Sequence, residues 1–268
     1  LMAKNKEHTL STQEEVILAK TGLFSGIFQE AFGMFDNLDI SFKSFKNSEG
    51  QKVELSHGLY GLMLQSHSRS DRKKAFESMF GAFKANVNTL AMNYAGNVKK
   101  DWFFAKIRGF ASALDYSMYR ENVPSTCYKK LLEAVGDGTK LMHKYIALRK
   151  RALGLKNHNM YDLFLPLVPE QELSLSYEQA VDTVKDALKV MGEDYSKVLA
   201  SAFESGGVDV YESKGKRSGA YSWGVYGVHP FVLLNYQPTV NDVFTIAHEI
   251  GHSLHSYYSS QTQPEQNA

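Results

Sequence analysis

The sequence predicts a mainly α-helical fold with two small β regions. Apolar residues recur at helical spacing through most of the 268 residues. Several of these segments start at a residue that caps helices well, and only two short stretches have strand character. The chain contains no internal repeat and no low-complexity segment. With 43% hydrophobic residues it can bury a substantial core, as one large domain or two smaller ones.

The N-terminal part predicts one helix followed by a β-hairpin. Ser11 is placed to cap a helix that runs into the mid-thirties. Residues 47–50, Asn-Ser-Glu-Gly, form a turn signal between the apolar stretches 40–45 and 53–55. These patterns predict a short hairpin.

Helical segments fill most of the middle of the chain. We predict helices over the following stretches: from Ser70 to about Tyr94, from about Val98 to Tyr119, a pair starting at Pro124 and separated near residues 136–138, and from Tyr177 to Phe203. A boundary near residues 66–70 is expected to separate an N-terminal helix-and-hairpin region, 1–68, from a larger domain, 69–268.

A short apolar run precedes the last helix. It extends from His229 to Tyr236, and proline follows its first residue. Because proline is confined to strand starts and edges, we predict an edge strand. An edge strand can add an extended peptide through main-chain hydrogen bonds, although an ordinary core strand fits the periodicity as well.

The last helix carries the most informative pattern, His-Glu-Ile-Gly-His. Thr239 is its expected N-cap, and His248 and His252 lie four residues apart, on one helix face. Two imidazoles at this spacing suit two corners of a tetrahedral zinc site. Glu249 points beside that site, where its carboxylate could accept a proton from water instead of binding metal. Gly251 inside the helix is expected to mark the close approach of another backbone.

The residues around this pattern resemble the thimet oligopeptidase family of zinc metallopeptidases, and within it the oligoendopeptidase F group. The resemblance is strongest over the stretches 209–222, 227–236 and 248–256, and it extends more diffusely to 88–91, 105–108, 123–124 and 148–163. It implies a helical zincin-type (gluzincin) peptidase with a small hairpin and edge-strand region beside the zinc helix. It also implies a deep channel that admits short peptides and excludes folded proteins.

The same resemblance implies a third zinc ligand, a glutamate on a following helix. The sequence ends at Ala268, so we expect 69–268 to be a catalytic domain that is incomplete at its C-terminus. Glu265 is a weak substitute because it precedes the family's ligand position. His255 lies about 10 Å along the helix axis from His248, and a role in support of the site or in the core fits it better than ligation.

Substrate contacts are expected where the edge strand and the glycine-rich stretch approach the motif. The predicted substrate-binding residues are Gly219, Tyr226, His229, Val232, Leu233, Leu234 and Asn235. The basic cluster at residues 214–217 lacks the spacing of a phosphate-binding loop, and a solvated hairpin tip is the better interpretation.

Composition excludes several other classes of function. A net charge of +1 gives no general attraction to nucleic acid or anionic membranes. Cys127 is the only cysteine, so an internal disulfide framework is impossible, and a buried thiol is expected there. Residues 1–8 lack the apolar core of a signal peptide, which favours the cytoplasm.

The sequence therefore predicts a cytoplasmic zinc endopeptidase, with one zinc ion in each complete active site and short peptides as substrates. The 268 residues themselves are expected to be an inactive piece of it. A non-catalytic peptide-binding or structural product is the alternative, and metal content together with peptide cleavage would separate the two. A zincin of another lineage would need a third histidine or an acid at a different spacing.

Overall fold

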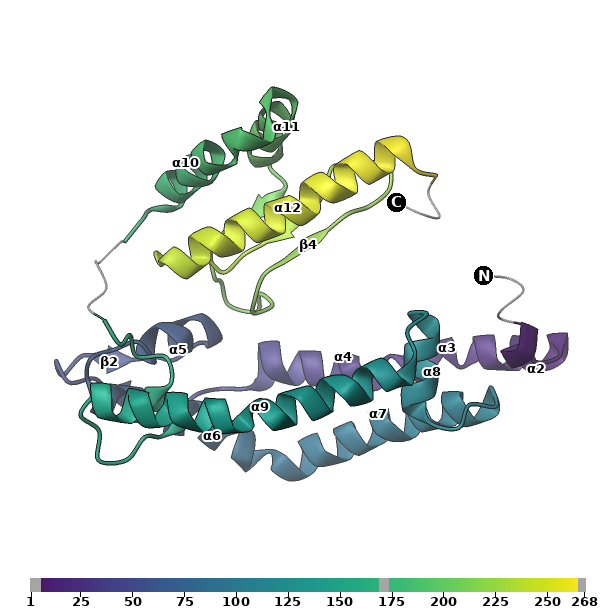
Figure 1. Cartoon of the computed structure of the whole chain (residues 1–268), viewed down its shortest axis with the longest axis horizontal. Coiled ribbons are helices and arrows are strands. Elements are labelled where there is room, and N and C mark those ends of the chain that lie inside the picture. The colour runs from purple at the N-terminus through teal and green to yellow at the C-terminus, as the bar shows by residue number, and fades with distance from the viewer. Residues whose placement is uncertain (1–5, 169–173, 265–268) are drawn as a thin grey trace. The chain divides into compact units, whose positions relative to one another are not determined.

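The computed structural model describes residues 6–168 and 174–264, and it divides them into two units (Figure 1). Of the described residues, unit 1 contains 6–54 and 68–167, and unit 2 contains 55–67, 168 and 174–264. Helices dominate both units, as predicted. The division differs from the predicted boundary at residue 68, because the segment 55–67 packs with the C-terminal unit.

Unit 1 is built from helices and one small hairpin. Its helices are α2 (Thr12–Lys20), α3 (Gly22–Ser25), α4 (Ile27–Met34), α6 (Arg69–Ala85), α7 (Val87–Ile107), α8 (Ala113–Arg120) and α9 (Ser125–Ala152), with the short turns η1 (Lys6–His8), η2 (Phe35–Asp39) and η3 (Met160–Asp162). The hairpin pairs β1 (Phe45–Lys46) antiparallel with β2 (Lys52–Val53). Ser11 caps α2 in a complete capping box with Glu14, which confirms the predicted start.

Helix breaks in unit 1 fall at different places from those predicted. The first helix is interrupted at Thr21 and Gly26. Ser68, and not Ser70, caps α6, and α7 runs without a break through Gly96. Helix α9 continues through Gly136 and its neighbours, where a separation was expected. A glycine inside a long helix costs about 1 kcal/mol, which the other residues of a 28-residue helix outweigh.

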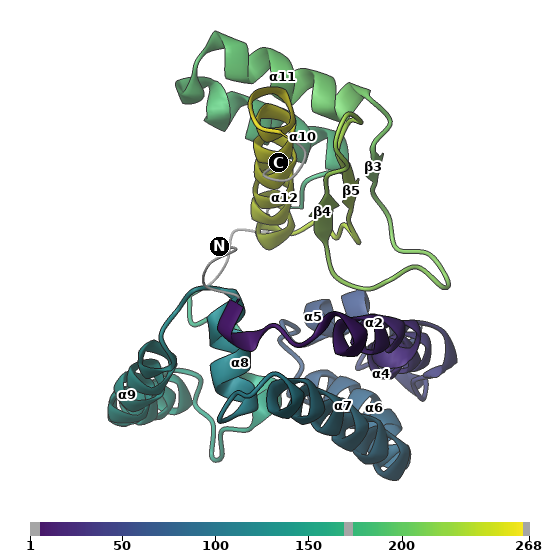
Figure 2. The same cartoon turned by 90° about the vertical axis from the view of Figure 1, so that its right-hand side faces the viewer.

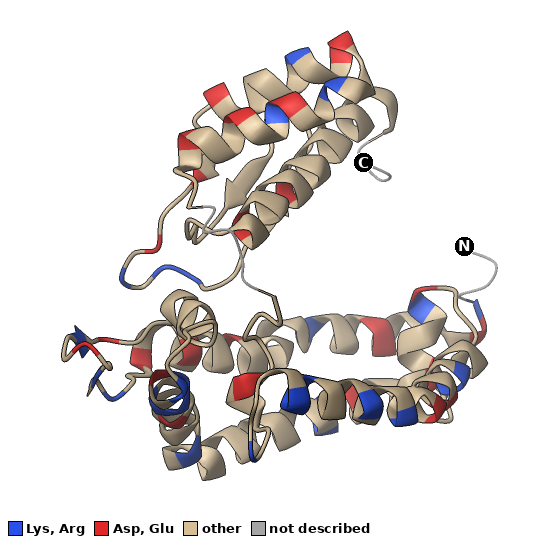
Figure 3. Cartoon of the chain, turned by 60° about the vertical axis from the view of Figure 1, so that its left-hand side comes forward, with Lys and Arg blue, Asp and Glu red and all other residues tan. Residues whose placement is uncertain are grey.

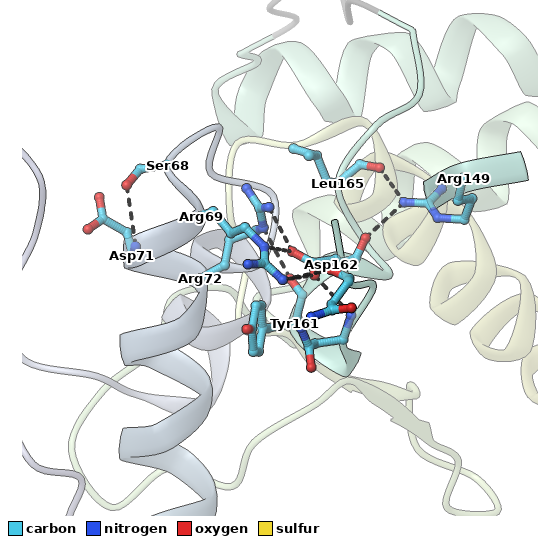
Figure 4. A network of polar contacts seen from close by, with 10 residues as sticks. Ser68, Arg69, Asp71, Arg72, Arg149, Tyr161, Asp162 and Leu165 are labelled. Carbon is cyan, nitrogen blue, oxygen red and sulfur yellow. Dashed lines mark hydrogen bonds and ion pairs between the residues drawn. The ribbon is translucent and has the colours of Figure 1, made fainter. Parts of the chain in front are cut away.

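A buried polar network joins α6 to the segment after α9 (Figure 4). The carboxylate of Asp162 is fully buried and accepts hydrogen bonds from Arg69 at 3.0 Å and Arg72 at 2.8 Å. Arg149, also buried, donates to the carbonyl oxygens of Asp162 and Leu165 at 3.0 and 2.5 Å. Because a buried charge is tolerated only when it is paired and hydrogen-bonded, this network fixes α6, η3 and α9 together.

Unit 2 combines helices with a three-stranded sheet. Its elements are α5 (His57–Met63), α10 (Tyr177–Ala187), η4 (Leu188–Met191), α11 (Glu193–Glu204), β3 (Val208–Asp209), β4 (Tyr221–Trp223), β5 (Phe231–Leu233) and α12 (Val240–Thr262). The helix predicted from Tyr177 to Phe203 is broken at Gly192, whose φ of 100° lies outside helical conformation.

The core of unit 2 lies where α10, α11 and β5 pack on α12 (Figure 1). Ile246, Ile250 and Leu254 of α12 are each at most 2% exposed and meet Val184, Leu199 and Val232 in one cluster. Strand β5 is the middle strand, parallel to β3 and antiparallel to β4 (Figure 2). The sheet and the helix pair thus hold α12 along its length.

Cys127 is exposed on α9, so the expectation of a buried thiol is wrong. Helix α9 exposes several large side chains on the same surface, among them Leu131 and Val135. Among the described residues, no helix is both long enough and apolar enough to cross a membrane.

Candidate active site on helix α12

Helix α12 starts where the sequence predicts. The Thr239 backbone is extended, and its hydroxyl accepts a hydrogen bond from the amide of Asp242 at 3.1 Å. The Asp242 carboxylate in turn accepts from the hydroxyl of Thr239 and from the amide of Gln237 at 3.1 Å. These bonds satisfy amide groups that a helix leaves free at its first turn.

The two faces of α12 have opposite character. Ile246, Ile250 and Leu254 form the buried stripe, at the spacing of one helix face. His248 and His252 are exposed on another side. The helix has no lysine or arginine, and the two acidic side chains are visible as the red segments of α12 (Figure 3). The histidines therefore face solvent on a helix that the core holds in place.

The side chains of His248 and His252 point toward one another. Their Nε2 atoms are 3.1 Å apart, and their ring planes are nearly perpendicular. Two nitrogens at about 2.0 to 2.1 Å from a tetrahedral zinc ion lie about 3.3 Å from each other. The imidazole pair therefore fits two corners of a zinc site. Among the described residues, no group of three histidine, cysteine or acidic side chains is arranged to hold a metal.

Glu249 lies beside this pair in a shared groove. Its side chain is only 9% exposed, although it is a carboxylate on a surface helix. Together with His252 it lines a groove of about 480 Å³ between α12 and β4. A carboxylate that is shielded from bulk water beside an imidazole pair can act as an acceptor for a proton from a water molecule.

Strand β4 forms the other side of the groove. Ser222 of β4 and Ser253 of α12 are joined by a hydrogen bond of 2.8 Å between their hydroxyl oxygens. At the end of the strand, a Cβ atom added to Gly224 would come within 2.7 Å of Ser256. The hydroxyl pair and this close approach place β4 directly against α12. Since β4 pairs only with β5, its outer edge borders the groove.

The predicted edge strand is a central strand, so that prediction is wrong. The amides of Val232 and Leu234 donate to Gly207 and Asp209 on the β3 side, each at 2.8 Å. On its other side, the register of β5 pairs Leu233 with Tyr221 of β4. A strand that begins with proline can still be central when a neighbour is only two residues long, as β3 is. The edge next to the groove belongs to β4 instead.

The structure distributes the predicted substrate-binding residues over separate surfaces. Gly219, Leu234 and Asn235 line a cavity beside α5. His229 and Val232 line a small cavity on the α11 side, and Val232 is 3% exposed. The remaining two are Tyr226, whose hydroxyl donates to the carbonyl of Gln263 at 3.3 Å, and Leu233 within the sheet. Their roles in substrate binding stay predictions. The main-chain pairing of a peptide with β5, on which these predictions were based, is not possible because β5 is already paired on both sides.

Tyr236, at the end of the predicted strand, belongs mainly to the core. It is 6% exposed, and its hydroxyl donates to the carbonyl of Leu175 at 2.8 Å. Burial raises its pKa above the usual value, and burial likewise raises the pKa of Tyr177, which packs against it, to about 12. Both phenols are therefore neutral in the physiological range.

Of three expectations about the neighbourhood of the motif, two need correction and one cannot be placed. An added Cβ at Gly251 would meet nothing within 4 Å beyond its own helix, so no other backbone among the described residues approaches it. His255 is exposed and lines the same groove as Glu249, which excludes a core role. Glu265 lies outside the described residues.

Sequence reasoning missed two parts of the site. One is the hydroxyl pair of Ser222 and Ser253, for which no local signal exists because 31 residues separate its members. The other is α5, whose start is capped by Ser56 through the amide of Leu59 at 3.1 Å. Ser56 could have been recognised in the sequence as an N-cap. Gly58 and Gly61 could have indicated that one face of the short helix carries no side chains.

Comparisons with known proteins agree on one family. Residues 62–268 match the sequence pattern of peptidase family M3. The chain is 38% identical to oligopeptidase PepF of Bacillus subtilis, covering 98% of this chain and 39% of that protein. It is 39% identical to the chromosomal oligoendopeptidase F of Lactococcus lactis subsp. cremoris, covering 98% and 44%.

A solved structure gives the same result. The oligoendopeptidase F of Enterococcus faecium aligns with a TM-score of 0.65 at 28% identity, over 96% of this chain and 41% of that one. The chain thus spans about two fifths of the length of the relatives that it matches.

Proposed function

The chain belongs to peptidase family M3, and we propose that it contributes two zinc ligands and the general base to an endopeptidase that cleaves short peptides. His248 and His252 are the proposed ligands, and Glu249 is the proposed base. The observation that carries this assignment is the 3.1 Å separation of the two Nε2 atoms beside a shielded carboxylate. A third ligand would come from outside the described residues.

The proposed chemistry is hydrolysis of a peptide bond by water. Bound zinc would supply Lewis acidity, which makes a water molecule reactive at neutral pH and polarises the substrate carbonyl. Glu249 accepts a proton from the attacking water and then donates it to the leaving amine. The position of its carboxylate on the groove wall, close to His252, suits both transfers.

Peptide binding is assigned to the outer edge of β4. The strand Tyr221–Trp223 can pair with an extended peptide through main-chain hydrogen bonds. Such bonds recognise the peptide backbone and depend little on its side chains. This mode favours unstructured peptides with loose sequence preference and gives no role to nucleic acid or membrane. The single cysteine is consistent with a cytoplasmic location, which is part of the proposal.

The first prediction tests the general base. In the complete gene product, Glu249→Gln keeps zinc but lowers peptide hydrolysis roughly 10²- to 10⁴-fold, because it removes a proton acceptor and not a ligand. Hydrolysis is measured with a quenched fluorescent peptide and zinc by atomic absorption. Glu133→Gln, an exposed change on α9, is the control and keeps full activity.

Histidine variants test the ligands in the same assay. His252→Ala loses zinc, whereas His255→Ala, one turn further along the same exposed surface, retains it. Normal turnover of the Glu249 variant, or zinc loss from the His255 variant, would contradict the assignment. Peptide binding without zinc or cleavage would instead favour a non-catalytic peptide-binding protein.

A further inference from the structure

A second cavity of unit 2 adjoins the groove, and we call it the α5 pocket. Its volume is about 380 Å³. Gly61 and Leu62 of α5 form one wall, Gly219 and Asn235 another, and Thr245 of α12 lies at its base. The residues of the His-Glu-Ile-Gly-His motif do not line this cavity, although three of the predicted substrate-binding residues do.

Hydrogen bonds hold the walls of the α5 pocket. The Ser56 hydroxyl donates to the Glu212 carboxylate at 2.9 Å, which ties the start of α5 to the loop between β3 and β4. The side-chain amide of Asn235 donates to the carbonyl oxygens of Arg217 and Gly219 at 2.9 and 2.7 Å. These hydrogen bonds hold the loop between β3 and β4 on both sides of the pocket. They therefore fix the shape of the cavity.

The α5 pocket adjoins the groove at one residue. Ala220, the residue before β4, lines both cavities. Glu249 and His252 lie in the groove, along β4, and the α5 pocket lies beyond the first residue of that strand. A peptide that pairs with the outer edge of β4 and extends past Tyr221 therefore enters the α5 pocket.

The distance along α12 gives the number of peptide residues involved. Residues 241–246 border the α5 pocket, and residues 248–252 carry the proposed ligands and base. The centres of these segments are six to seven residues apart, or about 10 Å at 1.5 Å per helical residue. An extended peptide covers about 10 Å in three residues.

We propose that the α5 pocket receives the substrate residue about three positions from the scissile bond. This inference rests on the proposed function. The lining is mainly glycine, aliphatic and uncharged polar, and the carboxylate of Asp242 is already bonded to Thr239 and Gln237. The pocket therefore suits an uncharged side chain.

Gly61 offers a direct way to fill the pocket. A Cβ atom added there would meet nothing within 4 Å, so a side chain has room to extend from α5. Gly61→Phe occupies the cavity, and Gly61→Ala is the matched change that leaves most of it open. Gly136→Phe, at another helical glycine with open space, controls for a bulky substitution away from the pocket.

The experiment compares kcat/KM for peptides of increasing length in the complete gene product, with cleavage positions determined by mass spectrometry. Gly61→Phe lowers kcat/KM about tenfold or more for peptides with three or more residues on one side of the scissile bond. Peptides with two residues on each side keep the original value, as do all peptides with Gly136→Phe, and Gly61→Ala gives a smaller loss for the longer peptides than Gly61→Phe. An equal effect on short and long peptides, or none on either, would overturn the inference.

The two proposals fail in distinguishable ways. If peptides are hydrolysed but Gly61→Phe has no length-dependent effect, the proposed role of the α5 pocket is wrong and the peptidase assignment stands. If no peptide is cleaved, anisotropy of fluorescein-labelled peptides of four and eight residues replaces kinetics. Weaker binding of the longer peptide alone then supports the α5 pocket without the peptidase, and unchanged binding of both overturns it.

Discussion

At the scale of single residues, two buried carboxylates differ in what surrounds them. Asp162 is fully buried and bonded to two guanidinium groups, which is a structural arrangement. Glu249 is almost as shielded, but it faces a groove next to an imidazole pair. The surroundings of Asp162 indicate a structural role, and those of Glu249 are compatible with its proposed role as general base.

The Asp162 network gives a stability prediction. Asp162→Asn leaves Arg69 and Arg72 without their anion, so we expect unit 1 to lose about 3 to 5 kcal/mol of unfolding free energy. Urea denaturation followed by circular dichroism measures the loss. Asp137→Asn, on the exposed surface of α9, changes stability by less than about 0.5 kcal/mol. An equal effect of both variants would show that the network contributes nothing.

The same carboxylate gives a pH dependence. Burial opposes its ionisation, but hydrogen bonds from Arg69 and Arg72 outweigh burial and hold the pKa of Asp162 below its ordinary value. A lowered folded-state pKa gives stability that is complete above the unfolded value of about 3.9 and is lost as pH falls below it. We therefore expect stability of the original chain to fall between about pH 4 and 2 more steeply than that of Asp162→Asn. Parallel acid-unfolding curves would contradict this.

At the scale of elements, close packing between β4 and α12 shapes the groove. Two glycines in this region have different surroundings: Gly224 faces Ser256 at contact distance, while Gly251 faces open space. The sequence predicted a close approach at Gly251 and none at Gly224. Only the position of a neighbouring element distinguishes them.

Matched alanine substitutions test this difference. Gly224→Ala forces β4 away from Ser256, and we expect a loss of about 1 to 3 kcal/mol in unfolding free energy. Gly251→Ala removes a helix-destabilising glycine without a clash, and stability rises by up to about 1 kcal/mol. Thermal unfolding of both variants provides the measurement. A stabilising alanine at 224 would show that the strand does not lie against α12.

At the scale of the whole molecule, the described residues contain two of the three ligands that the proposed metal site needs. Two imidazoles are in place, whereas catalytic zinc normally has three protein ligands and an open position. Because the chain covers about two fifths of its relatives, the remaining ligand is proposed to lie in sequence beyond these 268 residues.

Zinc affinity tests that view. We expect the 268-residue chain to bind zinc much more weakly than the complete gene product and to show little or no peptidase activity. Zinc content after extensive dialysis, measured by atomic absorption, compares the two. Stoichiometric zinc in the shorter chain would mean that another of its groups, such as His255 or Glu265, completes the site.

The sequence alone determined the features that depend on neighbours within a few residues. The caps at Ser11 and Thr239 are local hydrogen bonds, and the spacing of His248 and His252 follows from helical repeat. For the same reason, the helical class and the family resemblance were visible without coordinates.

Tertiary structure decided what distant segments do to one another. Strand β5 became central because β3 and β4 both pair with it, and the segment 55–67 joined the C-terminal unit across more than 100 residues of sequence. Periodicity records which face of an element is buried, but not which partner buries it. The outer edge of β4, the groove and the α5 pocket therefore follow only from long-range packing.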